Sequence, residues 1–216
     1  AAGQGKNILF EAQLGALRDI DYGIYPFTSS SNTIASYAPI GAGIPGCALD
    51  NVVGVMKAYS TCVGEGPFVA ETAMGEAWNE KLRESGGEFG AATGRPRRVG
   101  PFDAVASRYG IRCQKAQDIA LTKLDVLGAF DKIPVITGYR LHGVLLDSFP
   151  TDSRLEEAEP VIEELPGWEC DISGCRSWKD LPENARKYVC TLEKLVDHPI
   201  YLVSTGAERD AYLLRE

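Results

Sequence analysis

Two kinds of apolar segment alternate along this chain, and the alternation limits the possible fold more than any other feature. Short apolar runs at 119–121, 134–140 and 200–203 predict strands. Helices are expected at 102–113 and at 180–196, the second with Asp180 as its N-cap. Strands that alternate with helices favour a mostly parallel central sheet with helices on both faces. We therefore predict an α/β fold.

Other segments give weaker patterns. A strand is predicted at 7–13. A helix is predicted at 49–59, because Leu49, Val52, Val53, Met56 and Tyr59 recur at spacings of three and four. The acidic stretch 153–165 is predicted to be helical, with its glutamates on the wet face. The turn-rich stretch 25–46 is longer than most irregular segments of compact domains, so it is a candidate ligand wall.

Composition limits the partners of the chain. An apolar fraction of 44% in 216 residues suffices for one large domain. The net charge of −8 argues against nucleic acid, which needs a basic face. No apolar run approaches the roughly 18 residues that span a bilayer, so we expect a soluble, cytoplasmic protein without a membrane partner. Six scattered cysteines, two histidines and no C-x-x-C pair favour free thiols over a zinc site. Asp19 and Asp21 are expected to make structural hydrogen bonds rather than to bind a metal.

The sequence Thr122-Lys123-Leu124-Asp125 directly follows the predicted strand at 119–121. An aspartate there can accept hydrogen bonds from both N1–H and the 2-amino group of guanine, a pairing that adenine cannot make. The aliphatic stem of Lys123 can lie along the base. No G-x-x-x-x-G-K-[ST] phosphate loop occurs in the 216 residues. The chain is therefore predicted to read guanine without carrying the loop that would hold the phosphates.

Cationic side chains are concentrated in the stretch 88–98, Glu88-Phe89-Gly90-Ala91-Ala92-Thr93-Gly94-Arg95-Pro96-Arg97-Arg98. Its three arginines supply forked donors that match carboxylates or phosphates. Its small residues would let a ligand approach the backbone. The alternative is a solvated turn whose arginines pair with surface carboxylates, a kind of pair that contributes little to stability. From the residues alone, the two interpretations carry roughly equal weight.

A set of motifs extends this picture over nearly the whole chain. They are I-L-F-E at 8–11, D-I-D-Y-G-I-Y-P at 19–26, S-S-N at 30–32, K-A-Y-S at 57–60, V-G-E-G-P-F at 63–68, the stretch 88–98, L-T-K-L-D-V-L at 121–127, P-G-W at 166–168 and S-T-G at 204–206. In order and spacing they closely resemble the adenylosuccinate synthetase family. The resemblance implies that GTP phosphorylates the 6-oxygen of IMP and that the amine of L-aspartate then displaces phosphate to give adenylosuccinate. It also implies Mg²⁺ as cofactor, GTP as co-substrate, a homodimer and a mostly parallel central sheet.

The resemblance also assigns roles to residues of this chain. An IMP wall is expected at 7–46, a substrate loop at 88–98, and a guanine clamp at 119–127 and 203–209. Within them, Arg95 would meet the carboxylates of aspartate and the ribose of IMP. The predicted IMP-binding residues are Gln13, Leu14, Thr28, Ser29 and Arg95. The predicted aspartate-binding residues are Ala91, Ala92, Thr93, Gly94, Arg95, Pro96 and Arg97. The predicted GTP-binding residues are Arg97, Lys123, Leu124, Asp125, Ser204, Thr205 and Gly206.

Two departures from the family pattern bear on function. In place of the family's E-G-A-Q-G the chain has Glu11-Ala12-Gln13-Leu14-Gly15, so Leu14 stands where a glutamine contacts the IMP base. Gln13 comes one residue early, and on a strand it would point to the opposite face unless a bulge corrects it. The match also begins at the family's second half. The phosphate loop with its catalytic aspartate, the supporting histidine, the Mg²⁺ site and an arginine donated across the dimer would all belong to the first half, so no catalytic or metal-binding residue is assigned to this chain.

Three hypotheses follow. The first is the C-terminal half of a ligase, which contributes the guanine clamp and the aspartate loop and is inactive alone because phosphoryl transfer needs positioned metal and charge. The second is a non-catalytic purine-nucleotide-binding protein with the same fold. The third, suggested by Leu14, is a variant synthetase that acts on another purine nucleotide.

Overall fold

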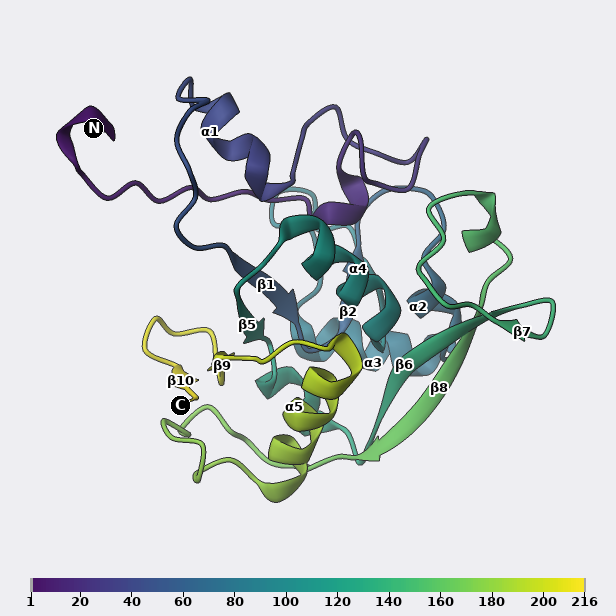
Figure 1. Ribbon diagram of the computed structural model, residues 1–216. Coiled ribbons are helices and arrows are strands. Elements are labelled where there is room, and N and C mark those ends of the chain that lie inside the picture. The colour runs from purple at the N-terminus through teal and green to yellow at the C-terminus, as the bar shows by residue number, and fades with distance from the viewer. Residues whose placement is uncertain (1, 216) are drawn as a thin grey trace.

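The apolar runs at 119–121 and 200–203 do form strands, and they lie side by side in the central sheet. The structure is a computed structural model, and it describes residues 2–215. The sheet has the order β1-β5-β9-β10, and its strands are β1 (Val53–Lys57), β5 (Asp118–Thr122), β9 (Leu202–Ser204) and β10 (Tyr212–Leu214). β1 and β9 both run parallel to β5, whereas the edge strand β10 is antiparallel to β9. The predicted α/β class with a parallel sheet is thus confirmed (Figure 1).

A second sheet is built around the predicted strand at 134–140. This strand is β6 (Lys132–Leu141), and it pairs parallel with β4 (Phe102–Asp103) and antiparallel with β7 (Val144–Leu145) and β8 (Glu159–Pro166). In Figure 1, β6 and β8 form the long twisted ribbon beside the central sheet. A separate antiparallel pair consists of β2 (Ser60–Cys62) and β3 (Arg98–Gly100).

Helices pack around these sheets. The α-helices are α1 (Ala38–Gly41), α2 (Val69–Thr72), α3 (Glu76–Gly86), α4 (Ala104–Gln114) and α5 (Glu183–Val196). The 3-10 turns are η1 (Ala2–Gln4), η2 (Ala16–Arg18), η3 (Ala35–Tyr37), η4 (Asp125–Ala129) and η5 (Ser153–Leu155). None of the helices within 2–215 combines the length and apolar character needed to cross a membrane.

The two long helices predicted from the sequence are confirmed. The Asp103 side chain caps α4 by accepting a hydrogen bond from the Ala106 N–H at 3.0 Å, as expected for a residue at a helix start. α5 begins later than predicted, after Pro182, and Asp180 does not cap it. The Asp180 carboxylate instead accepts hydrogen bonds from the backbone N–H groups of Arg176 and Ser177, which form the preceding turn.

The main core lies where α5 packs against the central sheet. Tyr188 of α5 is buried and donates its hydroxyl to the carbonyl oxygen of Ala58 at 2.6 Å, directly after β1. Its ring also meets the edge of Trp168, with ring centroids 5.9 Å apart. The hydrogen bond from Tyr188 therefore holds the end of β1 against α5. That end of β1 belongs to the candidate site described below.

The predicted strand at 7–13 is wrong. Residues 7–13 carry no regular secondary structure, and Leu9 is 94% exposed. This part of the chain leaves the body as an extended arm, seen at the left of Figure 1. A strand needs a neighbour that satisfies its backbone groups, and no strand of the described chain pairs with this arm.

The predicted helix at 49–59 is also wrong. Its middle part is β1, whose residues from Val53 to Lys57 pair in register with 118–122. The spacings of three and four are compatible with a helix, but Val53 and Val55 are β-branched and Gly54 disfavours a helix interior. A Cβ at Gly54 would lie 2.8 Å from the end of the Ile119 side chain and 3.1 Å from the Ala116 Cβ, so glycine lets these side chains pack close to the strand.

The acidic stretch 153–165 is a turn followed by a strand, not a helix. η5 covers its start and β8 its end. The glutamates are exposed as predicted, but Glu159, Glu163 and Glu164 line the surface of a strand. Eight paired positions with β6 outweigh the local helix preference of glutamate. The six cysteines are free thiols, as predicted.

Candidate functional site

Three chain segments meet at the carboxyl edge of the central sheet. Because β1, β5 and β9 run in the same direction, the residues that follow them emerge at one edge. The segments are 57–59 at the end of β1, 122–125 at the end of β5, and 204–206 at the end of β9. A hydrogen bond of 2.8 Å from the Ala58 N–H to the Thr122 carbonyl holds the first two together. Open α/β sheets bind ligands at this edge.

A buried glutamate connects this edge to the arginine-bearing loop. The side chain of Glu88 is 1% exposed and accepts hydrogen bonds from Lys57 Nζ at 2.8 Å, from the Tyr59 hydroxyl at 2.6 Å and from Arg97 Nη1 at 2.9 Å. Burial alone would raise the pKa of Glu88, but these three donors hold the pKa below its ordinary value. Burial and the Glu88 charge together raise the pKa of Tyr59, so Tyr59 keeps its proton and remains a donor.

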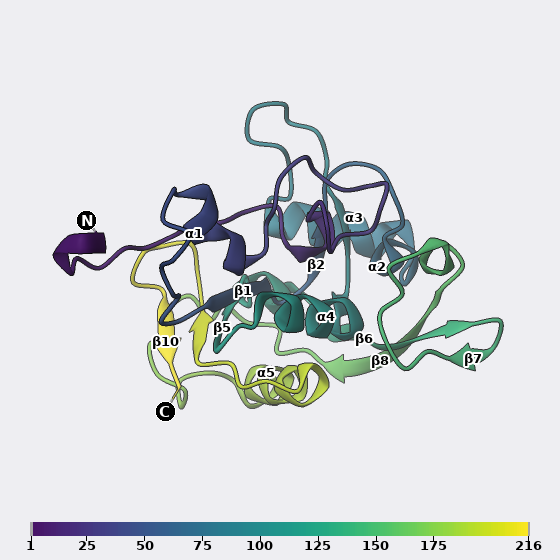
Figure 2. The same ribbon diagram turned by 45° about the horizontal axis from the view of Figure 1, so that its top comes forward.

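The stretch 88–98 forms a hairpin-like loop with an exposed tip. Phe89 and Pro96 form an isolated antiparallel bridge, and the N–H of Gly90 donates to the Arg95 carbonyl at 2.8 Å. Residues 91–95 at the tip are all exposed. In Figure 2 this loop, which follows α3, stands out from the body of the molecule. The base of the loop is therefore fixed while its tip faces solvent.

The three arginines of this loop have different environments. Arg97 pairs with Glu88, and Arg98 pairs with Glu71 at 2.6 Å. Arg95, at the exposed tip, has no ion pair with another residue in the range 2–215. Arg95 alone is thus available to an anionic ligand without breaking an existing bond.

The predicted guanine reader lies beside this cluster. Lys123 has a left-handed backbone (φ 63°), which turns the chain sharply after β5, and its Nζ donates to the Gly86 carbonyl at 2.9 Å. Asp125 then begins η4. Across residues 2–215 its half-buried carboxylate has no hydrogen-bond or ion-pair partner, so both oxygens can accept from a ligand.

The predicted IMP wall connects to the loop through residues 62–66. Arg18 donates to the carbonyl oxygens of Phe27 and, at 3.0 Å, of Glu65. From the other side, Arg98 donates to the Gly66 carbonyl at 2.8 Å. The segment with Thr28 and Ser29 is thereby joined to the foot of the arginine-bearing loop.

Asp19 makes structural hydrogen bonds within the segment 15–34, as predicted. Its buried carboxylate accepts hydrogen bonds from the N–H groups of Asp21 at 2.9 Å, Tyr22 at 3.0 Å and Ile34 at 3.2 Å. Burial would raise the pKa of Asp19, but the backbone donors lower the pKa below its ordinary value. The interpretation as structural hydrogen bonding is confirmed.

A sequence model of one family matches the chain from residue 1 to residue 213, and that family is adenylosuccinate synthetase. The chain belongs to this family. The adenylosuccinate synthetase of Trichlorobacter lovleyi is 51% identical over 211 residues, covering 97% of this chain and 49% of that protein. That of an Anaeromyxobacter species (strain Fw109-5) is 49% identical over 213 residues, covering 98% and 49%. The chain spans about half the length of the curated relatives it matches.

The fold agrees with a solved adenylosuccinate synthetase. The fully ligated enzyme of Plasmodium falciparum superimposes with a TM-score of 0.87 at 38% identity, covering 93% of this chain and 48% of that one. This agreement supports the motif-by-motif resemblance as one of architecture as well as sequence.

Not every predicted adenylosuccinate synthetase site residue presents its side chain to solvent. Leu124 and Thr205 are fully buried. The Thr205 hydroxyl donates to the Cys175 carbonyl at 3.2 Å, and the Ser204 hydroxyl donates to the Gly206 carbonyl at 2.9 Å. Leu124 and Thr205 can therefore meet a ligand only through backbone atoms, whereas the Asp125 side chain can meet it directly.

Gln13 and Leu14 do not follow the strand geometry assumed from the sequence. Both are exposed, and Leu14 has a left-handed backbone (φ 73°). Because residues 13 and 14 do not lie in a strand, their side chains need not point in opposite directions. The one-residue offset of Gln13 therefore does not by itself turn its side chain away from the predicted IMP site.

Lys57 and Tyr59 were missed as site residues. Both bond to Glu88 at the sheet edge. The available signal was the K-A-Y-S motif at 57–60, which the predicted helix at 49–59 placed in the wrong element. Correct assignment of β1 would have put Lys57 at a strand end.

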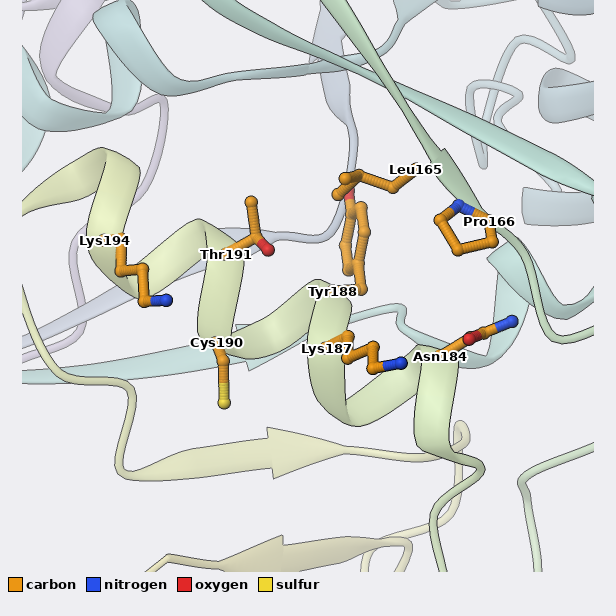
Figure 3. Close-up of a pocket in the computed structure, with 8 residues that line it drawn as sticks. All are labelled: Leu165, Pro166, Asn184, Lys187, Tyr188, Cys190, Thr191 and Lys194. Carbon is orange, nitrogen blue, oxygen red and sulfur yellow. The ribbon is translucent and has the colours of Figure 1, made fainter.

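One surface hollow lies away from the predicted site. It has a volume of about 250 Å³, lies between α5 and the end of β8 and is lined by Leu165, Pro166, Asn184, Lys187, Tyr188, Cys190, Thr191 and Lys194 (Figure 3). None of these is a predicted site residue. In the described range 2–215, no three His, Cys, Asp or Glu side chains gather into a group that could hold a metal ion.

Proposed function

We propose that the full-length protein joins IMP and L-aspartate at the expense of GTP, giving adenylosuccinate, GDP and phosphate. In this reaction the 6-oxygen of IMP takes the γ-phosphoryl group of GTP, and the aspartate amine then displaces it as phosphate. This chain would supply binding and orientation. Family membership over residues 1–213 supports the reaction class.

One observation carries the proposal for the GTP side. The free carboxylate of Asp125 lies at the carboxyl edge of the sheet, where the segments after β1, β5 and β9 meet. We infer that Asp125 accepts hydrogen bonds from guanine N1–H and the 2-amino group. The hydrogen bond from Lys123 to the Gly86 carbonyl would hold the lysine stem along the base. Ser204 and Gly206 would close over the guanine.

The aspartate and IMP side rests on the arginine-bearing loop. Of the three arginines in this loop, Arg95 is the one without an ion pair among residues 2–215, and its forked donors match a carboxylate. We propose that Arg95 binds the aspartate substrate and the IMP ribose, supported by the backbone of 91–97 and the Thr93 hydroxyl. Thr28 and Ser29 would offer hydroxyls to the IMP phosphate.

Magnesium is expected with GTP, where it would neutralise charge on the phosphates. Among residues 2–215, no three His, Cys, Asp or Glu side chains gather into a group that could hold the ion without the nucleotide. No step is therefore assigned to a metal held by these residues. A homodimer and a cytoplasmic location remain part of the proposal on the basis of the family resemblance.

The reaction can be tested on the full-length protein. With IMP, L-aspartate, GTP and Mg²⁺, we expect adenylosuccinate to appear, measured by chromatography. Omission of any one substrate should abolish it, and ATP should not replace GTP. Failure to form product from all three substrates would contradict the proposal, and equal rates with ATP would contradict the assignment of Asp125.

A second candidate function is a variant synthetase that accepts another purine nucleotide. The observation that favours it is Leu14, which is apolar and 52% exposed and is aligned with the glutamine that would contact the IMP base in the family. Kinetics with IMP, XMP and GMP as alternative acceptors separate the two functions. A preference for IMP supports the first.

A further inference from the structure

The P-G-W motif at 166–168 and the residues after it have no role in the proposed reaction, yet they connect the two parts of the guanine clamp. This segment, Gly167–Cys175, runs from the end of β8 toward α5. We call it the connecting segment. It touches η4, which begins with Asp125, at one end and the 204–206 loop at the other.

The first contact is with η4 and the residues after it. The Gly167 N–H donates to the Asp131 carbonyl at 2.7 Å, and a side chain at Gly167 would meet the Phe130 carbonyl oxygen at 1.9 Å. Gly128, inside η4, also lies against the connecting segment. A Cβ there would lie 2.5 Å from the Cys170 carbonyl oxygen. The absence of both side chains lets the backbone of the connecting segment touch η4.

The second contact is with the loop proposed to close over guanine. The buried Thr205 hydroxyl donates to the Cys175 carbonyl at 3.2 Å. A Cβ at Gly206 would lie 3.7 Å from the Ser173 side chain, so the two backbones are in close proximity. Thr205 thus faces the connecting segment and not solvent.

The connecting segment is itself well ordered by local bonds. The Asp171 carboxylate accepts from the Ser173 N–H at 2.8 Å and from its hydroxyl at 2.9 Å. The Ile172 side chain is fully buried in the main core. The connecting segment is therefore anchored to the core and can hold η4 and the 204–206 loop in place.

We propose that the connecting segment is a positioning element for guanine recognition, and that Thr205 is a positioning residue that acts through its hydrogen bond to Cys175. The hydrogen bond between Thr205 and Cys175 would fix the distance of Ser204 and Gly206 from the guanine base. The contact between Gly128 and the connecting segment would fix the position of η4, and with it Asp125. This inference rests on the proposed function, because it assumes that these two parts bind guanine.

The test compares Thr205→Val and Thr205→Ser in the full-length protein. Valine keeps the branched shape and removes the hydroxyl, whereas serine restores it. We expect Thr205→Val to raise both the KM for GTP and the Kd for GTP measured by calorimetry about fivefold, since one neutral hydrogen bond is lost. kcat and the KM values for IMP and aspartate should stay within about twofold of wild type. Thr205→Ser should return GTP binding toward the wild-type value. Thr151→Val, at an exposed position, is the matched control.

The possible results distinguish failure of the positioning role from failure of the proposed function. Wild-type turnover together with unchanged GTP affinity in Thr205→Val would overturn the positioning role alone. An equal rise in all three KM values with a lower Tm would also overturn it, since that indicates general loss of structure. If the wild type neither binds GTP nor forms adenylosuccinate, the proposed function fails and this inference fails with it. Gly128→Ala tests the other contact, the one between η4 and the Cys170 carbonyl. We expect it to weaken GTP binding in the same way, without a change in the KM values for IMP and aspartate.

Discussion

At the scale of single residues, Glu88 shows how a buried charge can connect parts of the site. It accepts hydrogen bonds from Lys57, Tyr59 and Arg97 and is almost without solvent contact. Glu88→Gln keeps the size but removes the charge and one acceptor oxygen. We expect a loss of about 2 kcal/mol in the free energy of unfolding, a moderate value because Lys57 and Arg97 are partly exposed. Urea unfolding at neutral pH measures it.

The stability difference between wild type and Glu88→Gln should depend on pH in a direction that the pKa of Glu88 determines. The pKa of Glu88 is lowered in the folded state, so its charge stabilises the protein above the unfolded pKa of about 4.5 and ceases to do so as pH falls through the folded value. The difference between wild type and Glu88→Gln should therefore shrink in acid. Glu84→Gln, at an exposed position of α3, is the control. A constant difference across pH would show that charge is not responsible.

Asp103 behaves in the opposite way. It is fully buried at the start of α4, and burial raises its pKa to about 6, against the hydrogen bonds from the Ala106 N–H and the Tyr139 hydroxyl. The folded state then binds its proton more tightly than the unfolded state, so this group lowers stability as pH rises from about 4 to about 6. Asp103→Asn should remove this effect. Relative to wild type, its free energy of unfolding should rise by about 3 kcal/mol between pH 3.5 and pH 7. An exposed control, Asp147→Asn, should show no such trend, and a flat difference for Asp103→Asn would contradict the raised pKa.

At the scale of elements, the sequence predicts those whose signals are local. α4 and α5 have amphipathic faces, and β5 and β6 are short apolar runs between turns. Two of the wrong predictions are at β1 and β8, where pairing with a strand distant in the sequence outweighs the local preference for a helix. β1 pairs with residues 118–122, more than sixty positions along the chain, and β8 pairs with β6 although it is rich in glutamate.

The same limit applies to the candidate site. Asp125 and the arginine cluster at 95–98 could be singled out because a strand-end aspartate and grouped arginines each have a direct chemical meaning, whereas the role of Arg95 itself came from the family resemblance. The buried position of Thr205 and the bonds of Glu88 to Lys57 and Tyr59 could not, because they exist only when three distant segments meet. The motifs identified which segments matter, but only the fold indicates which side chains face a ligand.

The arginine-bearing loop yields a prediction at this scale. Arg95 stands at an exposed tip while Arg97 and Arg98 are paired at the base. In the full-length protein, Arg95→Leu should lower kcat/KM for aspartate by about thirtyfold or more, since a bound carboxylate would lose its forked partner at a cost of about 2 to 5 kcal/mol. Arg112→Leu, at an exposed position of α4, should have little effect. An unchanged KM for aspartate with an unchanged kcat would mean that the loop is a solvated turn, the alternative raised from the sequence.

At the scale of the whole molecule, the chain spans about half the length of its relatives, and none of its 216 residues forms a G-x-x-x-x-G-K-[ST] loop. We therefore expect that the purified 216-residue chain does not form adenylosuccinate from IMP, GTP and aspartate under conditions in which the full-length protein does. Turnover by the chain alone, followed by chromatography, would contradict this. GTP binding by the chain, measured by calorimetry, would show whether the sheet edge suffices for recognition.

We propose that the parallel strands of this fold assemble a guanine site at their carboxyl edge, where Asp125 recognises the base. Asp125→Asn in the full-length protein replaces an acceptor by an amide donor opposite the 2-amino group of guanine. Steady-state kinetics with GTP and xanthosine triphosphate, on wild type and mutant, test the claim. We predict that kcat/KM for GTP falls about a hundredfold or more, while xanthosine triphosphate, whose 2-oxo group accepts from the new amide, loses much less or improves. A mutant that keeps the wild-type preference for GTP would contradict the claim.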